Sequence, residues 1–238
     1  MAKTHDLLIG KEWRKSARTI PIVNPFTDEA FADVCLADTA EIEEAIDLAD
    51  RAFAKSRNAP AFIRSRICAG VAQGIRDRSE DFARTIAMES GKPLVYARAE
   101  VIRSISTFEI ASHEALRLDG EMLTLDIAES ARGKSGLTRR LPIGPVSGIS
   151  PFNFPLNLVS HKVAPALACG NPIVIKPASS TPLTALLLGE VILNTEAVEG
   201  SFSVLPCSGK DATPLVEDPR FKMISFTGSP GVGWDIKR

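Results

Sequence analysis

Three polar residues in the middle of the sequence follow apolar runs, and they are the first candidates for chemistry. Asn153 follows the run 146–150, whereas Lys176 ends the run 171–176 and Ser179 follows it. An asparagine amide can donate N–H groups to an oxygen that becomes negative when a carbonyl is attacked. A lysine at a strand end can reach ribose hydroxyls or a phosphate. Ligands of open parallel sheets bind beyond the carboxyl ends of the strands, so the spacing predicts one shared site.

A glycine-containing segment near residue 230 predicts a second part of that site. Residues 226–233 read as a strand end followed by a helix start, with Ser229 suited to the N-cap and Pro230 to the first helical position. Free N–H groups at a helix start can bind a pyrophosphate. The segment is not GxGxxG, and a glycine-rich turn alone is weak evidence for a dinucleotide.

The elements that must position these residues alternate between strand and helix after residue 143. Such alternation predicts a parallel sheet with right-handed crossovers. Residues 39–116 carry four helical patterns, the first with Thr39 as its expected cap, and residues 7–36 read as an edge hairpin that covers the core. Residues 119–142 alternate around a polar stretch, with 137–141 as the returning strand. They predict a two-stranded ribbon that projects, or alternatively a hairpin folded on its own domain.

Composition excludes several classes of protein. The chain has 238 residues, 45% hydrophobic and 24% charged, with a net charge of −1, which gives no argument for nucleic-acid or membrane partners. No signal-peptide core or long apolar window is present, so we expect a cytoplasmic protein. Four separated cysteines without a CxxC pair predict neither a metal site nor disulfides. Cys169 is interpreted as a core thiol, and His161 as a helix-face histidine with a satisfied partner.

Five motifs together resemble the aldehyde dehydrogenase superfamily. They are LLIGKEWRKS at 7–16, MESGKP at 88–93, PFNFP at 151–155, IKPASSTPLTAL at 175–186 and FTGSPGVG at 226–233. The resemblance covers nearly the whole chain. It implies NAD(P)-dependent oxidation of a small-molecule aldehyde to an acid. In that reaction a cysteine attacks the aldehyde, Asn153 steadies the oxyanion and a glutamate activates water.

The resemblance also implies an architecture. We expect an α/β fold, a Rossmann-like parallel sheet with helices on both faces, an amino-terminal helical layer and a protruding β-ribbon arm. Residues 1–118 and 143–238 form the dinucleotide-binding domain, and 119–142 form an oligomerisation ribbon that pairs with a neighbouring subunit in a homodimer or homotetramer. The family's cysteine and glutamate lie downstream of FTGS. The chain is therefore expected to be the amino-terminal part of such an enzyme, and inactive alone.

The cofactor, NAD or NADP, is assigned residue by residue from the same resemblance. Ser229 would contact the pyrophosphate and Val232 the adenine, with Gly209 and Lys210 in the adenosine region. Ser179 replaces the glutamate of many NAD-preferring relatives, which removes a charge that would repel a 2′-phosphate, so NADP should be accepted. With Asn153 as the catalytic residue and no metal, the predicted cofactor residues are Ile149, Ser150, Pro151, Phe152, Lys176, Ala178, Ser179, Gly209, Lys210, Phe226, Thr227, Gly228, Ser229 and Val232.

Two alternatives stay open from the sequence. The substrate is expected to be a small hydroxyaldehyde or semialdehyde, of the kind exemplified by lactaldehyde, succinate semialdehyde and glyceraldehyde 3-phosphate. The rival to an enzyme is a truncated, non-catalytic module that binds dinucleotide or other subunits without turnover. A reading frame that continues past Arg238 into a glycine-flanked cysteine would favour the enzyme.

Overall fold

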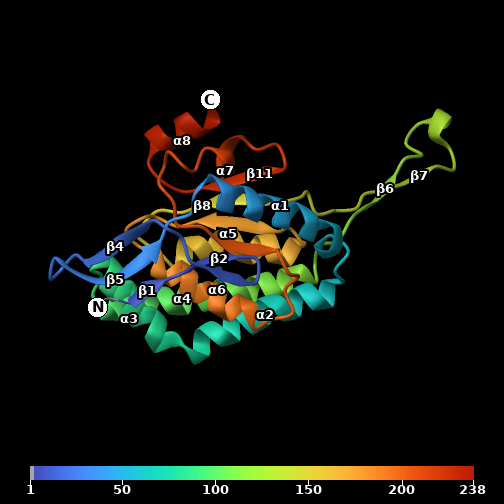
Figure 1. Ribbon diagram of the computed structural model, residues 1–238. Helices are drawn as coiled ribbons and strands as arrows, with labels where there is room; N and C mark the ends of the chain where they lie inside the picture. The colour runs from blue at the N-terminus through green and yellow to red at the C-terminus, as the bar shows by residue number, and fades with distance from the viewer. Residues whose placement is uncertain (1–2) are drawn as a thin grey trace.

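A six-stranded sheet forms the centre of the computed structural model, which describes residues 3–238 (Figure 1). The four strands that carry the predicted site run parallel, and β2 joins them antiparallel at β10. The parallel sheet expected after residue 143 is therefore confirmed. Its order is β11 (Met223–Phe226), β8 (Val146–Ile149), β9 (Ile173–Lys176), β10 (Phe202–Val204), β2 (Leu7–Ile9) and β3 (Glu12–Arg14).

Helices cover both faces of this sheet, as predicted. In β9 successive side chains point to opposite faces, so Val174 packs with α1 (Thr39–Ser56) and α7 (Pro214–Glu217). Ile173 and Ile175 pack on the other face, which carries α5 (Asn157–Cys169) and α6 (Leu183–Leu193). All three side chains are fully buried. Burial on both faces explains why this strand is a continuous apolar run.

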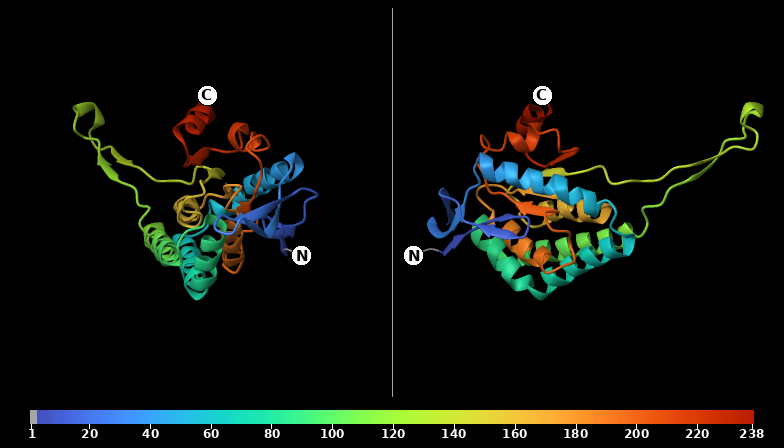
Figure 2. Two further views of the ribbon diagram at one scale, coloured as in Figure 1. Left: turned by 90° about the vertical axis from the view of Figure 1, so that its left-hand side faces the viewer. Right: turned by 45° about the vertical axis from the view of Figure 1, so that its right-hand side comes forward.

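An outer layer of helices lies over α5 and α6 (Figure 2). It consists of α2 (Ala61–Asp77), α3 (Ser79–Ser90) and α4 (Leu94–Ala115), with α4 packed on α5 and α2 on both crossover helices. The predicted amino-terminal layer is thus present. The first helix, α1, is not part of it, because its apolar stripe packs on the opposite face of the sheet.

The cap of α1 also differs from the expectation. The N-cap is Asp38 rather than Thr39. The Asp38 carboxylate accepts the N–H of Glu41 at 2.9 Å, and the Glu41 carboxylate accepts the N–H of Asp38 at 2.8 Å. This reciprocal pair is a capping box, which satisfies two of the free donors at the helix start.

The amino-terminal strands divide between two sheets. Strands β1 (Lys3–His5), β4 (Thr19–Asn24) and β5 (Glu29–Cys35) form a small sheet in the order β1-β5-β4. Strands β2 and β3 instead extend the central sheet, where β2 is at most 2% exposed. The expected edge hairpin is therefore only partly right, because β2 is a buried member of the main sheet.

Residues 119–142 form a ribbon that projects from the body (Figures 1 and 2). Strand β6 (Met122–Thr124) pairs antiparallel with β7 (Ser135–Leu137), and a short 3-10 turn, Glu129–Ala131, lies near the tip. The returning strand begins earlier than the expected 137–141. The ribbon exposes several large apolar side chains, which are Met122, Leu123, Leu125, Ile127 and Leu137.

Candidate functional site

The carboxyl ends of three parallel strands meet at one edge of the sheet. Ile149 at the end of β8 lies opposite Lys176 of β9 on one side and Phe226 of β11 on the other. The chain continues from β8 to β9 and β10 on one side, and returns to β11 on the other. The strand order reverses at β8, and such a switch point opens a crevice outside the strand ends.

One cavity at this edge has a volume of about 340 Å³. Four predicted cofactor residues line it: Ile149, Lys176, Gly209 and Val232. A Cβ on Gly209 would meet no atom within 4 Å, and the same holds for Gly231. Backbone therefore borders open space at both glycines.

A second cavity, of about 260 Å³, has Asn153 in its wall. The loop after β8 contributes Pro151, Phe152 and Asn153, and the loop after β11 contributes Thr227, Gly228 and Ser229, with Leu158 of α5 between them. Asn153 is exposed, and none of the hydrogen bonds within residues 3–238 uses its side-chain amide. The sequence motifs PFNFP and FTGS thus face the same space.

Other predicted residues lie beside these cavities without lining them. Ser150 is 6% exposed and its N–H donates to the carbonyl of Lys176 at 3.2 Å, which ties the ends of β8 and β9 together. The Phe226 ring lies against Gly228, where any Cβ would collide with it. Ala178 is half-buried in the loop after β9 and lines neither cavity.

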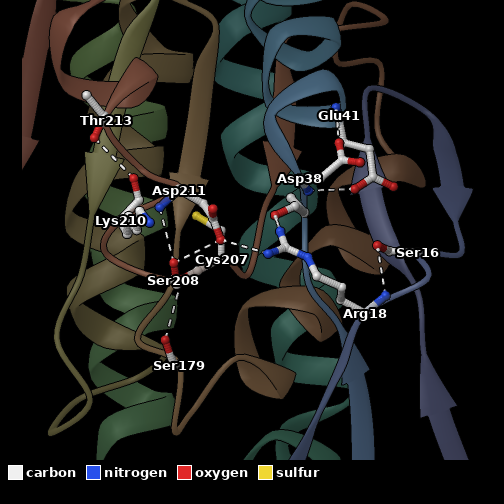
Figure 3. Close-up of polar contacts among 11 residues, drawn as sticks. Ser16, Arg18, Asp38, Glu41, Ser179, Cys207, Ser208, Lys210, Asp211 and Thr213 are labelled. Atoms are coloured by element: carbon white, nitrogen blue, oxygen red, sulfur yellow. Dashed lines mark hydrogen bonds and ion pairs between the residues drawn. The ribbon is translucent and has the colours of Figure 1, made fainter.

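Ser179 lies in the loop after β9, and Lys210 lies in the loop that follows β10 (Figure 3). The Ser179 hydroxyl donates to the carbonyl of Cys207 at 3.5 Å. Lys210 is exposed, and its carbonyl accepts a hydrogen bond from Thr213 at 3.1 Å. Neither side chain lines the larger cavity, although their neighbours Gly209 and Thr213 do.

The same loop is anchored to the amino-terminal strands (Figure 3). Asp211 accepts hydrogen bonds from Ser208 at 2.9 Å and from Arg18 at 3.2 Å, and Arg18 also donates to the carbonyl of Ala37 at 2.8 Å. The hydrogen bond from Ser208 and the charge of Arg18 hold the pKa of Asp211 below its ordinary value. These contacts fix the wall of the larger cavity.

Lys162 is a residue of this site that the sequence reasoning missed. It is 5% exposed on α5, and its Nζ donates to the hydroxyl of Thr227 at 2.7 Å. Burial lowers the pKa of Lys162 to about 8. The signal available in the sequence was the single lysine in the mostly apolar helix 157–169, which has no acidic residue to pair with it.

A buried ion pair holds the loop that carries Asn153. Lys92 pairs with Glu100, whose side chain is fully buried, and donates to the carbonyl of Asn153 at 2.9 Å. The Lys92 ammonium also lies 4.1 Å from the centroid of the Phe154 ring. Glu100 accepts the N–H groups of Leu156 and Asn157 at 3.0 and 3.1 Å. The outer helical layer therefore positions the loop directly.

Glu89 makes the equivalent contact at the start of α6. It accepts the N–H groups of Leu183 at 2.8 Å and Thr184 at 3.1 Å, and it also bonds the Thr184 hydroxyl. Burial raises the pKa of Glu89 to about 8. Both crossover helices thus begin at a buried carboxyl group from the outer layer.

The four cysteines are free and none lines either cavity. Burial raises the pKa of Cys68 to about 12 and of Cys207 to about 11, and it also raises the pKa of Cys169. Thiols of this kind are poor nucleophiles. Cys169, expected to be a core thiol, is only partly buried. Within residues 3–238 no group of three or more His, Cys, Asp or Glu could hold a metal, and no helix is both long and apolar enough to cross a bilayer.

Comparison with known proteins agrees with the motifs. A sequence profile of the aldehyde dehydrogenase family matches residues 13–238. The chain is 34% identical over 232 residues to 3-sulfolactaldehyde dehydrogenase of Priestia aryabhattai, covering 97% of this chain and 48% of the relative. It thus spans about half the length of the curated relatives that it matches.

Two solved structures are similar over almost the whole chain. One is aldehyde dehydrogenase 21 from Physcomitrella patens in complex with the reaction product succinate, with a TM-score of 0.97 and 42% identity, covering 100% of this chain and 50% of that one. The other is NADP-dependent glyceraldehyde-3-phosphate dehydrogenase from Bacillus halodurans C-125 complexed with NADP. Its TM-score is 0.95 at 33% identity, covering 98% of this chain and 50% of that one.

Proposed function

Because this chain belongs to the aldehyde dehydrogenase family, we propose that the full-length enzyme oxidises an aldehyde to a carboxylic acid with NAD or NADP. Residues 1–238 supply the dinucleotide site and the oxyanion asparagine. The observation that carries the proposal is a pair of cavities at the carboxyl ends of β8, β9 and β11. Lys176 lines the larger cavity, and Asn153 lines the smaller one.

The residues present fit a dinucleotide. The open space beside Gly209 and Gly231 lets a ligand approach the backbone at both residues. Lys176 can reach the ribose hydroxyls of that ligand. Helix α8 (Pro230–Lys237) begins at Ser229 without a side-chain cap, so its first N–H groups can bind a pyrophosphate. When bound, the nicotinamide accepts the hydride that leaves the aldehyde carbon.

Asn153 is proposed to donate its amide N–H to the aldehyde oxygen as that oxygen becomes negative. A donor of this kind is worth about 3–4 kcal/mol of transition-state stabilisation. Lys162 donates to the Thr227 oxygen, so the Thr227 hydroxyl proton is free to donate into the cavity. The nucleophilic cysteine is proposed to come from residues outside 1–238, because the thiols described here face neither cavity. The general-base glutamate is assigned to the same missing half, because the chain spans about half the length of its relatives.

The proposal extends to the choice between NAD and NADP and to the assembly of subunits. Ser179 leaves the adenosine end without the carboxylate that would repel a 2′-phosphate, and a relative at 33% identity is NADP-dependent, so NADP is accepted. The ribbon, residues 119–142, pairs with a neighbouring subunit in a homodimer or homotetramer. The enzyme acts in the cytoplasm.

Fluorescence titration tests the dinucleotide site in the 238-residue chain. Trp234 lies on α8 and is 60% exposed, so bound NADPH should quench its emission. Lys176→Met should weaken binding about tenfold, because it removes a charge-assisted contact. Lys134→Met, on the distant ribbon, should leave it unchanged. Equal affinities in all three proteins would contradict the assigned site.

Aldehyde oxidation is tested on the full-length enzyme. Asn153→Ala should lower kcat about 10²–10³-fold while dinucleotide affinity stays the same. A full-length protein that binds NADPH but oxidises no aldehyde in a panel of short aliphatic, hydroxylated and acidic aldehydes would instead be a non-catalytic dinucleotide-binding module.

A further inference from the structure

Three buried polar groups line one small cavity that shares no residue with the two cavities of the candidate site. Five buried side-chain N or O atoms have no hydrogen-bond partner within residues 3–238, and three of the five belong to this cavity. They are Ser56 Oγ at the end of α1, Arg64 Nε in α2 and Ser201 Oγ just before β10. The two serines are 6% and 3% exposed. Buried polar groups in folded proteins are almost always paired, so three unpaired ones in a single cavity indicate a bound ligand.

The remaining polar groups of these residues are bonded within the protein. The carbonyl of Ser201 accepts the N–H of Ile173 at 2.8 Å, which joins the starts of β9 and β10. Arg64 donates from Nη1 to the carbonyl of Ala168 at 2.9 Å, near the end of α5. These bonds hold both residues beside the cavity, so the unpaired atoms do not result from loosely placed side chains.

The size of the cavity limits the ligand to one small molecule. The volume open to the centre of a water molecule is about 20 Å³. A cavity holds a water when this volume exceeds about 10–15 Å³ and roughly two to four polar groups line it. Both conditions are met here, and a phosphate or a larger organic molecule would not fit.

The charges around the cavity favour a neutral ligand. The guanidinium of Arg64 pairs with no carboxylate in the part of the chain that the structure describes, so it would repel a cation. Helices α1 and α5 end at Ser56 and Cys169, and the negative ends of their dipoles would repel an anion. Arg64 Nε can only donate a hydrogen bond, whereas a serine hydroxyl can donate or accept. The ligand must therefore accept at least one hydrogen bond while remaining uncharged.

We propose that one water molecule is bound in this cavity as a fixed part of the fold. It accepts the N–H of Arg64 and forms hydrogen bonds with the hydroxyls of Ser56 and Ser201, which ties α1 and α2 to the start of β10. The site lies at the root of the ribbon, because Asn171 also lines the cavity and its Oδ1 accepts the N–H of Ile143 at 2.9 Å. The inference rests on the fold and does not depend on the proposed function.

Alanine variants test the water by the sign of their effect on stability. If each hydroxyl bonds the water, Ser56→Ala and Ser201→Ala should each lower the Tm of the 238-residue chain by about 2–4 °C. If the hydroxyls have no partner, their removal should raise Tm, because an unsatisfied buried group is lost. Ser147→Ala is the matched control, since the Ser147 hydroxyl of β8 is also buried and unpaired but does not line this cavity. It should not lower Tm.

A rise in Tm after removal of either cavity hydroxyl, or an equal fall in Ser147→Ala, overturns the inference. The double variant Ser56→Ala with Ser201→Ala shows whether the two hydroxyls share one ligand. It leaves the water with Arg64 alone, which is too few partners to hold it, so the Arg64 N–H also loses its partner. The fall in Tm should exceed the sum of the single falls by about 2 °C or more, and an additive result overturns the shared water.

A high-resolution crystal structure of the chain tests the site directly. It should show one water within about 3.2 Å of Ser56 Oγ, Arg64 Nε and Ser201 Oγ. The same water should be missing from the double alanine variant. A dry cavity in the wild-type protein, or an ion in place of the water, overturns the inference.

Discussion

Replacing Lys92 with methionine tests whether the outer helices position the loop that carries Asn153. The change removes the cation from a pair in which the Glu100 side chain is fully buried and Lys92 is 15% exposed. It also removes the 2.9 Å bond to the carbonyl of Asn153. Breaking a buried pair from one side costs about 3–5 kcal/mol. We expect the lower end, about 3 kcal/mol, because two N–H groups of α5 still bond Glu100.

A loss of about 3 kcal/mol corresponds to a fall in Tm of roughly 6–12 °C for a chain of this length. Arg98→Met is the matched control, because Arg98 lies on the same helix as Glu100 and forms an exposed ion pair with Glu80 of α3. Breaking that pair should cost less than about 1 kcal/mol. Urea denaturation followed by circular dichroism measures both values. NADPH affinity should fall in Lys92→Met alone, because Pro151 and Phe152 belong to the same loop.

The double variant Lys92→Met with Glu100→Gln completes the test. It removes the unpaired buried charge while the Gln carbonyl can still accept the N–H groups of α5, so part of the lost stability should return. If Lys92→Met lies within about 1 kcal/mol of Arg98→Met, or if the double variant is less stable than Lys92→Met alone, the ion pair does not position this loop.

Three further predictions concern the cofactor, a buried acid and the ribbon. Ser179→Glu should weaken NADP binding about tenfold or more relative to NAD, measured by calorimetry, because it places a carboxylate near the 2′-phosphate; unchanged NADP affinity would contradict the charge argument. Glu89 has a folded-state pKa raised to about 8, so its contribution to stability is complete below about pH 4.5 and is lost as pH rises through 8. Urea unfolding of Glu89→Gln should accordingly show a flatter pH dependence than wild type between pH 5 and 8, and parallel curves would refute this. Exchanging Met122 and Leu137 for serine should lower the subunit number of the full-length enzyme in sedimentation experiments, whereas an unchanged mass would separate the ribbon from assembly.

Local signals in the sequence predicted much of the fold. One of the four helical patterns, Ser79–Ser90, is marked at both ends: acidic residues lie in its first turn, and Gly91 ends it with a left-handed φ of 68°. The alternation of strands and helices predicted the parallel sheet. The capping box of Asp38 and Glu41 is also visible in the sequence, because an acid follows Asp38 by three residues. The prediction of Thr39 as the cap did not take this acid into account.

Contacts between distant segments could not be predicted in the same way. The spacing of apolar residues shows that α1 has an apolar stripe, but it does not show against which face of the sheet that stripe packs. Glu89 and Glu100 lie in helical patterns with ordinary polar faces, and their roles depend on helix starts that are far along the chain.

The two buried glutamates, Glu89 and Glu100, fix the number of residues that can separate them in the chain, because each binds the start of a different helix. Each residue of an α-helix turns the side-chain direction by about 100°, so one residue inserted between Gly91 and Glu100 would swing that carboxylate away from α5 while Glu89 stayed on α6. The starts of α5 and α6 could then not both keep their carboxyl acceptor. Chain-length changes should accordingly be tolerated in the turn at the tip of the ribbon and rejected in this short interval, although both segments lie outside the cavities themselves.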